Sequence, residues 1–136
     1  GLGDRFVVPG FVTDAAAISC DADLFLLTSQ NEGTPNALLE AMAVGCCCLS
    51  TDVGAVPVVL GDGLEEAMVA VDDATGMADR AVDLLTDEER RIRLARREQT
   101  RTVTTFGFDI SMRAYEDCLA SARSQHPTSE RPDRTR

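Results

Sequence analysis

The sequence contains no lysine and no tryptophan, and its only histidine is His126. No apolar run reaches the length of a membrane span, and the start of the chain does not resemble a signal peptide. The cysteines are odd in number and match no zinc-binding spacing. They are Cys20, Cys46, Cys47, Cys48 and Cys118. We therefore expect no metal site, no transmembrane segment and a reducing, cytoplasmic location, with peripheral attachment of the full-length protein to a membrane left open.

Because lysine is absent, all 13 basic residues are arginines, against 23 acidic residues, and the formal net charge is -10. Residues 1–87 carry 15 acids and only two arginines, Arg5 and Arg80, for a net charge of -13. Residues 88–136 carry a net charge of +3. A strongly acidic protein repels phosphate backbones, so we expect no nucleic-acid partner. The length of 136 residues and the hydrophobic content of 44% are enough for one domain with its own core.

Apolar runs alternate with helical patterns along the chain. The run from Leu24 to Leu27 is typical of a strand buried on both faces, and the cysteine triplet 46–48 is most simply the apolar part of another strand. The predicted strands are 5–8, 24–27, 46–50 and 67–71, and the predicted helices are 15–20, 35–44, 56–60, 72–85, 86–104 and 108–121. This alternation predicts an α/β domain with a mainly parallel sheet over residues 1–123, followed by a polar, disordered tail, 124–136.

Two polar loops, 28–34 and 51–55, each follow a predicted strand. Parallel strands place their carboxyl ends at one edge of the sheet, and α/β domains bind ligands there. The first loop runs into a helix, with Thr34 predicted as its N-cap, Pro35 as its first residue and Gly45 as its left-handed stop. The start of such a helix offers free N–H groups and the positive end of a dipole to anions and to hydroxyl oxygens.

Two glutamates, Glu32 and Glu40, flank seven residues that begin with Gly-Thr-Pro-Asn. Together with Asp23–Ser29 before it and Thr51–Pro57 after it, this string resembles the E-x7-E signature of retaining glycosyltransferases with the two-domain GT-B fold. Within that class it is most similar to the family 4 type, the glycosyl transferases group 1. The resemblance extends over about residues 5–119. It implies a partial Rossmann-like domain, the second half of a C-terminal donor-binding domain.

Members of this family bind a nucleotide-activated sugar between two Rossmann-like domains and transfer the sugar with retention at its anomeric carbon, usually without a metal. The resemblance therefore implies a nucleotide-diphosphate sugar as partner and no cofactor beyond that substrate. It also implies an acceptor domain outside this chain, which begins with Gly1 and is expected to be a fragment. The implied substrate-binding residues surround the start of the central helix. They are Glu32, Gly33, Thr34, Asn36, Ala37, Leu38 and Glu40.

The position of each residue in the motif implies its role. Glu32 is implied as the catalytic residue that orients the donor sugar. The backbone N–H groups between Glu32 and Ala37 are implied to meet sugar hydroxyls, and the helical turn at Ala37 and Leu38 is implied to approach the diphosphate. Glu40 is implied to accept hydrogen bonds from the ribose hydroxyls, a task that suits a carboxylate because it is an acceptor only.

Several features depart from the family pattern. Val58 stands where an acidic residue is common, Cys47 where proline is common, and Glu65-Glu66 where a glycine is common. Cations that would balance a diphosphate are scarce, because the first 87 residues contain only two arginines. We therefore expect this chain alone to be inactive. Two alternatives stay open: a non-catalytic nucleotide-sugar-binding or structural module, and an epimerase or phosphorylase of the same fold.

Overall fold

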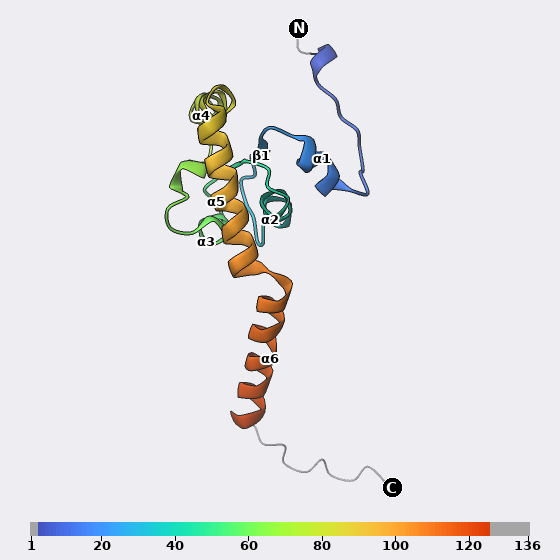
Figure 1. Ribbon diagram of the computed structural model, residues 1–136, viewed down its shortest axis with the longest axis vertical. Coiled ribbons are helices and arrows are strands. Elements are labelled where there is room, and N and C mark those ends of the chain that lie inside the picture. The colour runs from blue at the N-terminus through green and yellow to red at the C-terminus, as the bar shows by residue number, and fades with distance from the viewer. Residues whose placement is uncertain (1–2, 126–136) are drawn as a thin grey trace. The chain divides into compact units, whose positions relative to one another are not determined.

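The computed structural model describes residues 3–125, which are shown in Figure 1. The chain divides into two compact units, one ending at Thr102 and the other beginning at Val103. The elements are η1 (Gly3–Arg5), α1 (Ala15–Asp21), β1 (Phe25–Leu27), α2 (Asn36–Ala43), β2 (Cys48–Thr51), α3 (Val56–Leu60), η2 (Glu65–Ala67), β3 (Met68–Val69), α4 (Ala74–Thr86), α5 (Glu88–Phe106) and α6 (Phe108–Gln125). Within the described residues, none of these helices combines the length and the apolar character that a membrane span requires.

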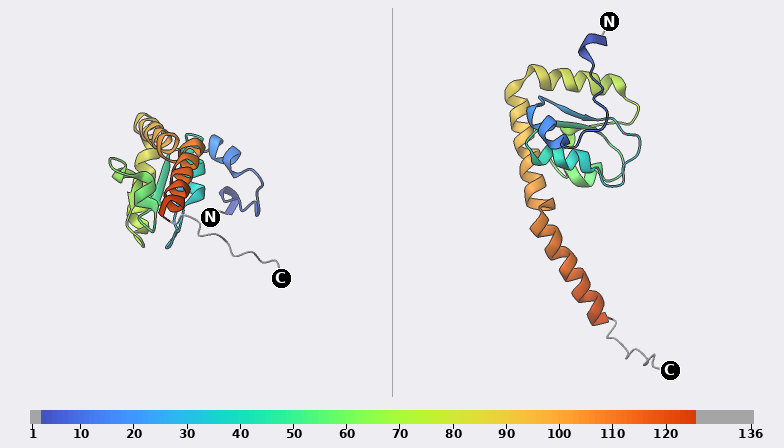
Figure 2. Two further views of the ribbon diagram at one scale, coloured as in Figure 1. Left: turned by 90° about the horizontal axis from the view of Figure 1, so that it is seen from below. Right: turned by 90° about the vertical axis from the view of Figure 1, so that its right-hand side faces the viewer.

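The three strands form a parallel sheet in the order β1-β2-β3, in which Leu27 pairs with Ser50. In the right-hand view of Figure 2, α4 and α2 lie on opposite sides of the strands. On the α4 side, Leu49 of β2 packs with Val69 of β3 and Met77 of α4. The α/β fold with a parallel sheet that was predicted from the sequence is confirmed, and it has the form of a partial Rossmann-like domain.

The helices predicted from the sequence are all present. Asp14, Asp73 and Asp87 cap α1, α4 and α5, because each carboxylate accepts from a backbone N–H three residues on, at 2.8 to 3.0 Å. The last helix runs further than predicted, to Gln125. The predicted disordered tail, 124–136, lies outside the described residues except for its first two, which belong to α6.

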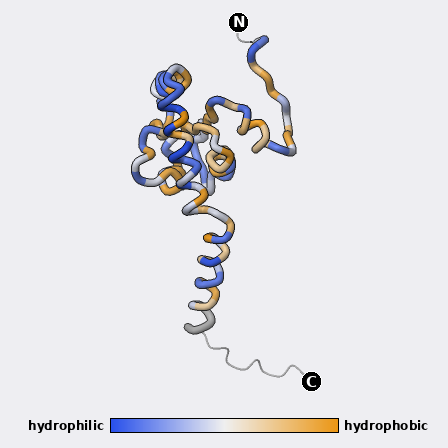
Figure 3. Tube along the Cα trace, viewed as in Figure 1, coloured by the Kyte–Doolittle hydropathy of each residue, from blue (hydrophilic) through white to orange (hydrophobic). Residues whose placement is uncertain are grey.

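Two strand predictions need correction. The segment 5–8 is not a strand: η1 ends at Arg5, and Phe6 and Val8 are 75% and 77% exposed. The apolar character of this segment is plain in Figure 3, but an extended chain becomes a strand only when its N–H and C=O groups pair with a neighbour, and none of the three strands found among residues 3–125 pairs with it. The predicted strand 67–71 is reduced to β3, because a 3-10 turn precedes it and the chain turns sharply at a left-handed Asp72.

The start of α2 also differs from its prediction. The N-cap is Pro35 rather than Thr34, and no side chain caps the helix, because the Thr34 carbonyl instead accepts from the Asn36 N–H at 2.9 Å in a tight turn. The predicted stop is confirmed. Gly45 has a φ of 85°, and its N–H and that of Cys46 donate back to the last turn of α2.

The cysteine triplet lies in the core, as predicted. The strand begins two residues later than expected, at Cys48, but Cys46, Cys47 and Cys48 are all buried and carry free thiols. Burial raises the pKa of each of these thiols, that of Cys47 to about 12, so they stay protonated at neutral pH. They therefore behave as small apolar side chains.

A glutamate on α5 is the most unusual member of the core. Glu98 is 0% exposed, and its Oε2 accepts from the Cys48 N–H at the start of β2, at 2.9 Å. Its Oε1 has no hydrogen-bond partner among the described residues. Burial raises the pKa of this carboxyl to about 8, against the lowering effect of the Cys48 N–H, and the Glu66 carboxylate raises it further while Arg97 opposes that effect. At neutral pH Glu98 is therefore mainly protonated.

Burial of Glu98 makes the stability depend on pH. The carboxyl of a glutamate in an unfolded chain has a pKa of about 4.3. Between this pH and about 8, the folded protein keeps a proton on Glu98 that the unfolded chain has lost. The free energy of unfolding therefore falls as the pH rises through this range. Glu98→Gln keeps an acceptor for the Cys48 N–H and cannot ionise. We expect it to unfold at a higher temperature than the wild type at pH 8 and to show a smaller advantage at pH 4.5, as measured by thermal unfolding.

The matched control is Asp79→Asn, which changes an exposed carboxylate on α4 and should follow the wild type at both pH values. If Glu98→Gln is equally destabilised at pH 4.5 and pH 8, the buried carboxyl does not cause the pH dependence.

Candidate functional site

The two polar loops meet at the carboxyl ends of β1 and β2, as predicted. The Thr51 hydroxyl at the end of β2 donates to the Ser29 carbonyl at 2.5 Å and lies 3.4 Å from the Leu27 carbonyl. Gly54 has a φ of 52°, and a Cβ at this position would overlap the carbonyl oxygen of Glu32. The second loop therefore approaches the first so closely that only glycine fits at position 54.

The carboxylate of Glu32 is held by its own loop. The Ser29 hydroxyl donates to Glu32 Oε1 at 2.7 Å, and both side chains are half-buried. Because an ionised carboxylate can only accept, a hydroxyl donor is a natural partner for it, and hydrogen bonds to charged groups are stronger than neutral ones. The carboxylate is thus oriented on one oxygen, at the edge of the sheet that faces the start of α2.

The first turn of α2 presents free backbone groups and two polar side chains. It carries no side-chain cap, and its Asn36 N–H donates to the Thr34 carbonyl, so the N–H groups of Ala37 and Leu38 are the ones that the first turn offers to a ligand. Asn36, Ala37 and Glu40 are exposed, and Asn36 and Glu40 lie four residues apart on one face. Leu38 is fully buried, so only its backbone can contribute to a site. Of the residues predicted for the site, Gly33, Thr34, Asn36, Ala37 and Glu40 are thus exposed and Glu32 is half-buried.

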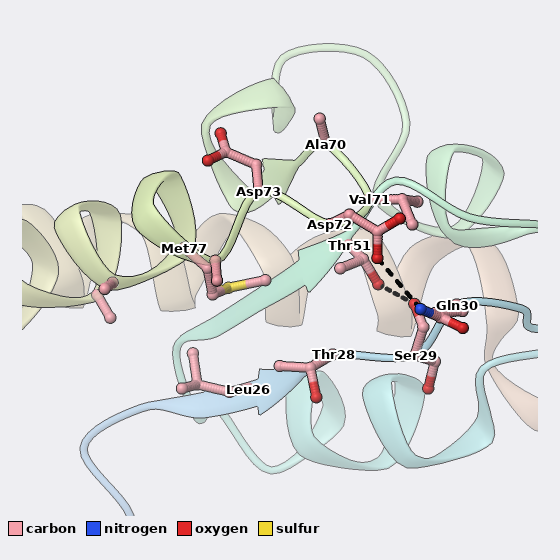
Figure 4. A pocket seen from close by; sticks show the side chains of 13 residues that line it. Leu26, Thr28, Ser29, Gln30, Thr51, Ala70, Val71, Asp72, Asp73 and Met77 are labelled. Atoms are coloured by element: carbon pink, nitrogen blue, oxygen red, sulfur yellow. Dashed lines mark hydrogen bonds between the residues drawn. The ribbon is translucent and has the colours of Figure 1, made fainter.

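A cavity of about 340 Å³, shown in Figure 4, is lined by both Ser29 and Thr51. Its walls combine apolar side chains with hydroxyls and carboxylates. The lining includes Leu26, Thr28, Ser29, Gln30, Thr51, Asp72, Met77 and Ala81. None of the predicted residues between Glu32 and Glu40 lines the cavity. The link between the cavity and the predicted site is Ser29, which lines the cavity and binds Glu32.

The loop that follows β3 was not among the residues predicted for the site. The Gln30 side-chain amide donates to Asp72 Oδ1 at 3.1 Å, and Asp72 holds a left-handed φ of 64° that is uncommon outside glycine. This bond joins the loop after β1 to the loop after β3. The signal was present in the sequence, because Asp72 follows a predicted strand in the same way as the other two polar loops do.

Four arginines bind acceptors away from the start of α2. Arg80, one of two in the first 87 residues, donates to the backbone carbonyl of Glu66 at 2.6 Å. On α5, Arg90 and Arg97 pair with the Glu66 carboxylate, at 3.2 and 3.0 Å. Arg101 donates to the carbonyls that end α3. These arginines therefore fasten the segment between α3 and β3, and Arg80 is directed to that segment rather than to the start of α2.

Comparison with known proteins shows which family this chain is similar to. Residues 1–87 match a family model described as glycosyl transferases group 1. The chain is similar to an N-acetyl-alpha-D-glucosaminyl L-malate synthase of Bacillus anthracis, with 35% identity over 115 residues that cover 85% of this chain and 30% of the relative. It is also similar to the lipopolysaccharide core biosynthesis mannosyltransferase LpsB of Rhizobium meliloti, with 33% identity over 116 residues that cover 84% of this chain and 33% of the relative.

A third relative is a D-inositol 3-phosphate glycosyltransferase of Corynebacterium efficiens, with 32% identity over 90 residues. That match covers 66% of this chain and 21% of the relative. The chain therefore spans a third or less of the length of these three relatives.

The contact between the two loops can be tested by adding one methyl group. Gly54→Ala should force the Glu32 carbonyl away and strain the backbone at a positive φ, so we expect a loss of stability of roughly 1–3 kcal/mol. Thermal unfolding measures this loss. Gly33→Ala is the matched control, because a Cβ at Gly33 meets nothing within 4 Å. Equal unfolding temperatures for the two variants would show that the loops do not require this approach.

Proposed function

The chain belongs to the glycosyl transferases group 1, and from this membership we propose that it is the donor-binding segment of a retaining enzyme that transfers a glycosyl group from a nucleotide-diphosphate sugar to an acceptor. One observation carries the proposal beyond the family. Glu32 is oriented by Ser29 and fitted against Gly54 at the carboxyl edge of the sheet, beside the uncapped first turn of α2. A carboxylate next to free N–H groups suits a ligand that combines hydroxyls with anionic oxygens.

In the proposed complex, Glu32 accepts a hydrogen bond from a hydroxyl of the donor sugar and orients the ring for transfer. The N–H groups of Gly33 and Thr34 meet further sugar hydroxyls. The Asn36 N–H, which the motif implies for the same task, already donates to the Thr34 carbonyl, so Asn36 contributes through its exposed side chain. The diphosphate lies at the positive end of α2, near the backbone of Ala37 and Leu38. These roles need no metal, since every group named is a hydrogen-bond donor or acceptor of the protein.

Glu40 has a separate part in the proposal. It lies one helical turn beyond Asn36 on the exposed face of α2, further from the loop that holds Glu32. We assign it to the ribose hydroxyls of the nucleotide. The acceptor and the nucleotide base would be recognised by other parts of a longer protein, in keeping with the third or less of the relatives' length that this chain spans.

The second candidate function is a non-catalytic module that binds or once bound a nucleotide sugar. Two observations favour it: Arg80 is turned toward Glu66, and the exposed Val58 stands where an acidic residue is common in the family. Kinetics on the complete enzyme separate the two candidates, because a module has no turnover to lose.

Glu32 and Glu40 should affect different kinetic constants in the complete enzyme. We expect Glu32→Ala to lower kcat by about a hundredfold or more, because contacts near the reacting carbon count most in the transition state. Glu40→Ala should instead raise KM for the donor with a smaller change in kcat, because a ribose contact is made equally in the ground state. Steady-state kinetics measure both. Glu88→Ala, an exposed glutamate on α5, is the control. Small and equal effects of Glu32→Ala and Glu40→Ala would contradict the assignment.

The chain by itself should bind donors weakly. Each charge-assisted hydrogen bond to the diphosphate that is missing costs about 1.5–3 kcal/mol, and Arg80 is directed to Glu66 rather than to the start of α2. Calorimetric titration of the isolated chain with UDP-, GDP- and ADP-sugars should therefore show no micromolar binding, while the complete enzyme binds one of them. Micromolar binding by a monomeric, folded sample of the chain would contradict this expectation.

A further inference from the structure

Two hydroxyl groups connect the end of β2 to the carboxylate of Glu32. The Thr51 hydroxyl, on a side chain only 7% exposed, donates to the backbone carbonyl of Ser29 at 2.5 Å. The hydroxyl of the same Ser29 donates to Glu32 Oε1 at 2.7 Å. Figure 4 shows the Thr51–Ser29 bond from the side of the cavity. The three residues thus form a chain that starts in the rigid sheet and ends at the carboxylate.

We infer that Ser29 and Thr51 are positioning residues for Glu32, with Thr51 holding the Ser29 backbone and Ser29 holding the Glu32 carboxylate. The inference rests on the proposed function, which gives Glu32 its task at the donor sugar. Neither residue belongs to the set that the motif implies, Glu32 to Glu40. Their part follows only from the bonds that connect the loop to the sheet.

The loop needs such a support because Glu32 lies on irregular backbone between β1 and α2. A carboxylate on a flexible side chain gains catalytic value only when its geometry is held close to the productive one. Gly54 limits the movement of the Glu32 main chain, because its own backbone abuts the Glu32 carbonyl. Ser29 limits the movement of the side chain. Together the two contacts restrict the residue at both ends.

The Ser29 bond also occupies one oxygen of the carboxylate and leaves the other free for the donor. A serine hydroxyl has one hydrogen to give, and here it is directed to Oε1. Among residues 3–125, no hydrogen bond from the protein is recorded to Glu32 Oε2, so this oxygen is the one left to accept from a sugar hydroxyl. Loss of the Ser29 hydroxyl would release the side chain, so that the carboxylate would no longer be held in one orientation.

The test uses conservative pairs at both positions in the complete enzyme. Ser29→Ala should lower kcat about tenfold, with KM for the donor within roughly twofold of the wild type, because the bond orients a group that acts in the transition state. Ser29→Thr keeps the hydroxyl and should restore most of the rate. Thr51→Val should lower kcat in the same way, and Thr51→Ser should restore it. The control is Ser19→Ala on α1, whose hydroxyl bonds only to its own helix.

A double-mutant cycle separates positioning from a general structural effect. In a Glu32→Ala background, Ser29→Ala should cause no further loss of kcat, because the carboxylate that it orients is absent. If the losses of the two single variants multiply instead, Ser29 acts independently of Glu32 and the inference is wrong. An unchanged kcat in Glu32→Ala alone would remove the proposed role of Glu32 itself, which is a distinct outcome. If Thr51→Val does not fold, the Ser29 variants and the cycle decide the matter by themselves.

Discussion

The parallel register of β1 and β2 is the constraint on which the site depends. Because Leu27 is level with Ser50, the two strands end together and their loops leave the sheet side by side. Only this register brings the Thr51 hydroxyl to the Ser29 carbonyl. A slip of one residue would turn the Thr51 side chain to the other face of the sheet and break that bond. The position of Glu32 is therefore set by the pairing of two strands that are only three and four residues long.

Such short strands need support from outside the sheet, and α5 supplies it. Its Glu98 carboxyl accepts from the first N–H of β2, its Gln99 amide donates to the Ala43 carbonyl at the end of α2, and its Arg101 donates to the end of α3. One helix thus holds the strand, the helix of the proposed donor site and the turn after the second loop. Guanidinium groups suit this task because several donors lie in one plane, so a single side chain can bind two acceptors. Three arginines of α5 also pair with acids of the first part of the chain: Arg90 and Arg97 with Glu66, and Arg91 with Asp23.

Local patterns predicted most of the fold, and the failures have two different causes. The apolar run at β1, the helix that ends at Gly45 and the capping aspartates depend on residues close in sequence, and they are correct. The segment 5–8 has the composition of a strand but depends on a distant partner, which composition cannot reveal. The cap of α2 failed for a smaller reason: the Thr34 carbonyl closes a turn with Asn36, and no local rule ranks that turn against a side-chain cap.

The candidate site was predicted in part for the same reasons. The motif implies a role for Glu32 and for the first turn of α2, which stays a prediction. The Thr51–Ser29 bond joins residues 22 apart and was not visible in the sequence. The burial of Glu98 could have been predicted from the sequence. It shares one face of α5 with Leu94 and Thr102, four residues before and after it, and both of these are buried. Helical periodicity alone therefore indicated that this glutamate faces the core.

Charge is the last constraint on the proposed function. The loops that follow β1, β2 and β3 carry Glu32, Asp52 and Asp72, while Arg80 is turned to the far segment at Glu66. A diphosphate at the start of α2 would gain roughly 0.3–1 kcal/mol from the helix dipole, a small gain in a segment that carries a net charge of -13 over residues 1–87. Under the proposed function, the cations that offset this repulsion belong to the part of the protein outside this chain. Donor binding would then require this segment and the cationic part together, because the acidity of this segment would prevent it from holding a nucleotide sugar by itself.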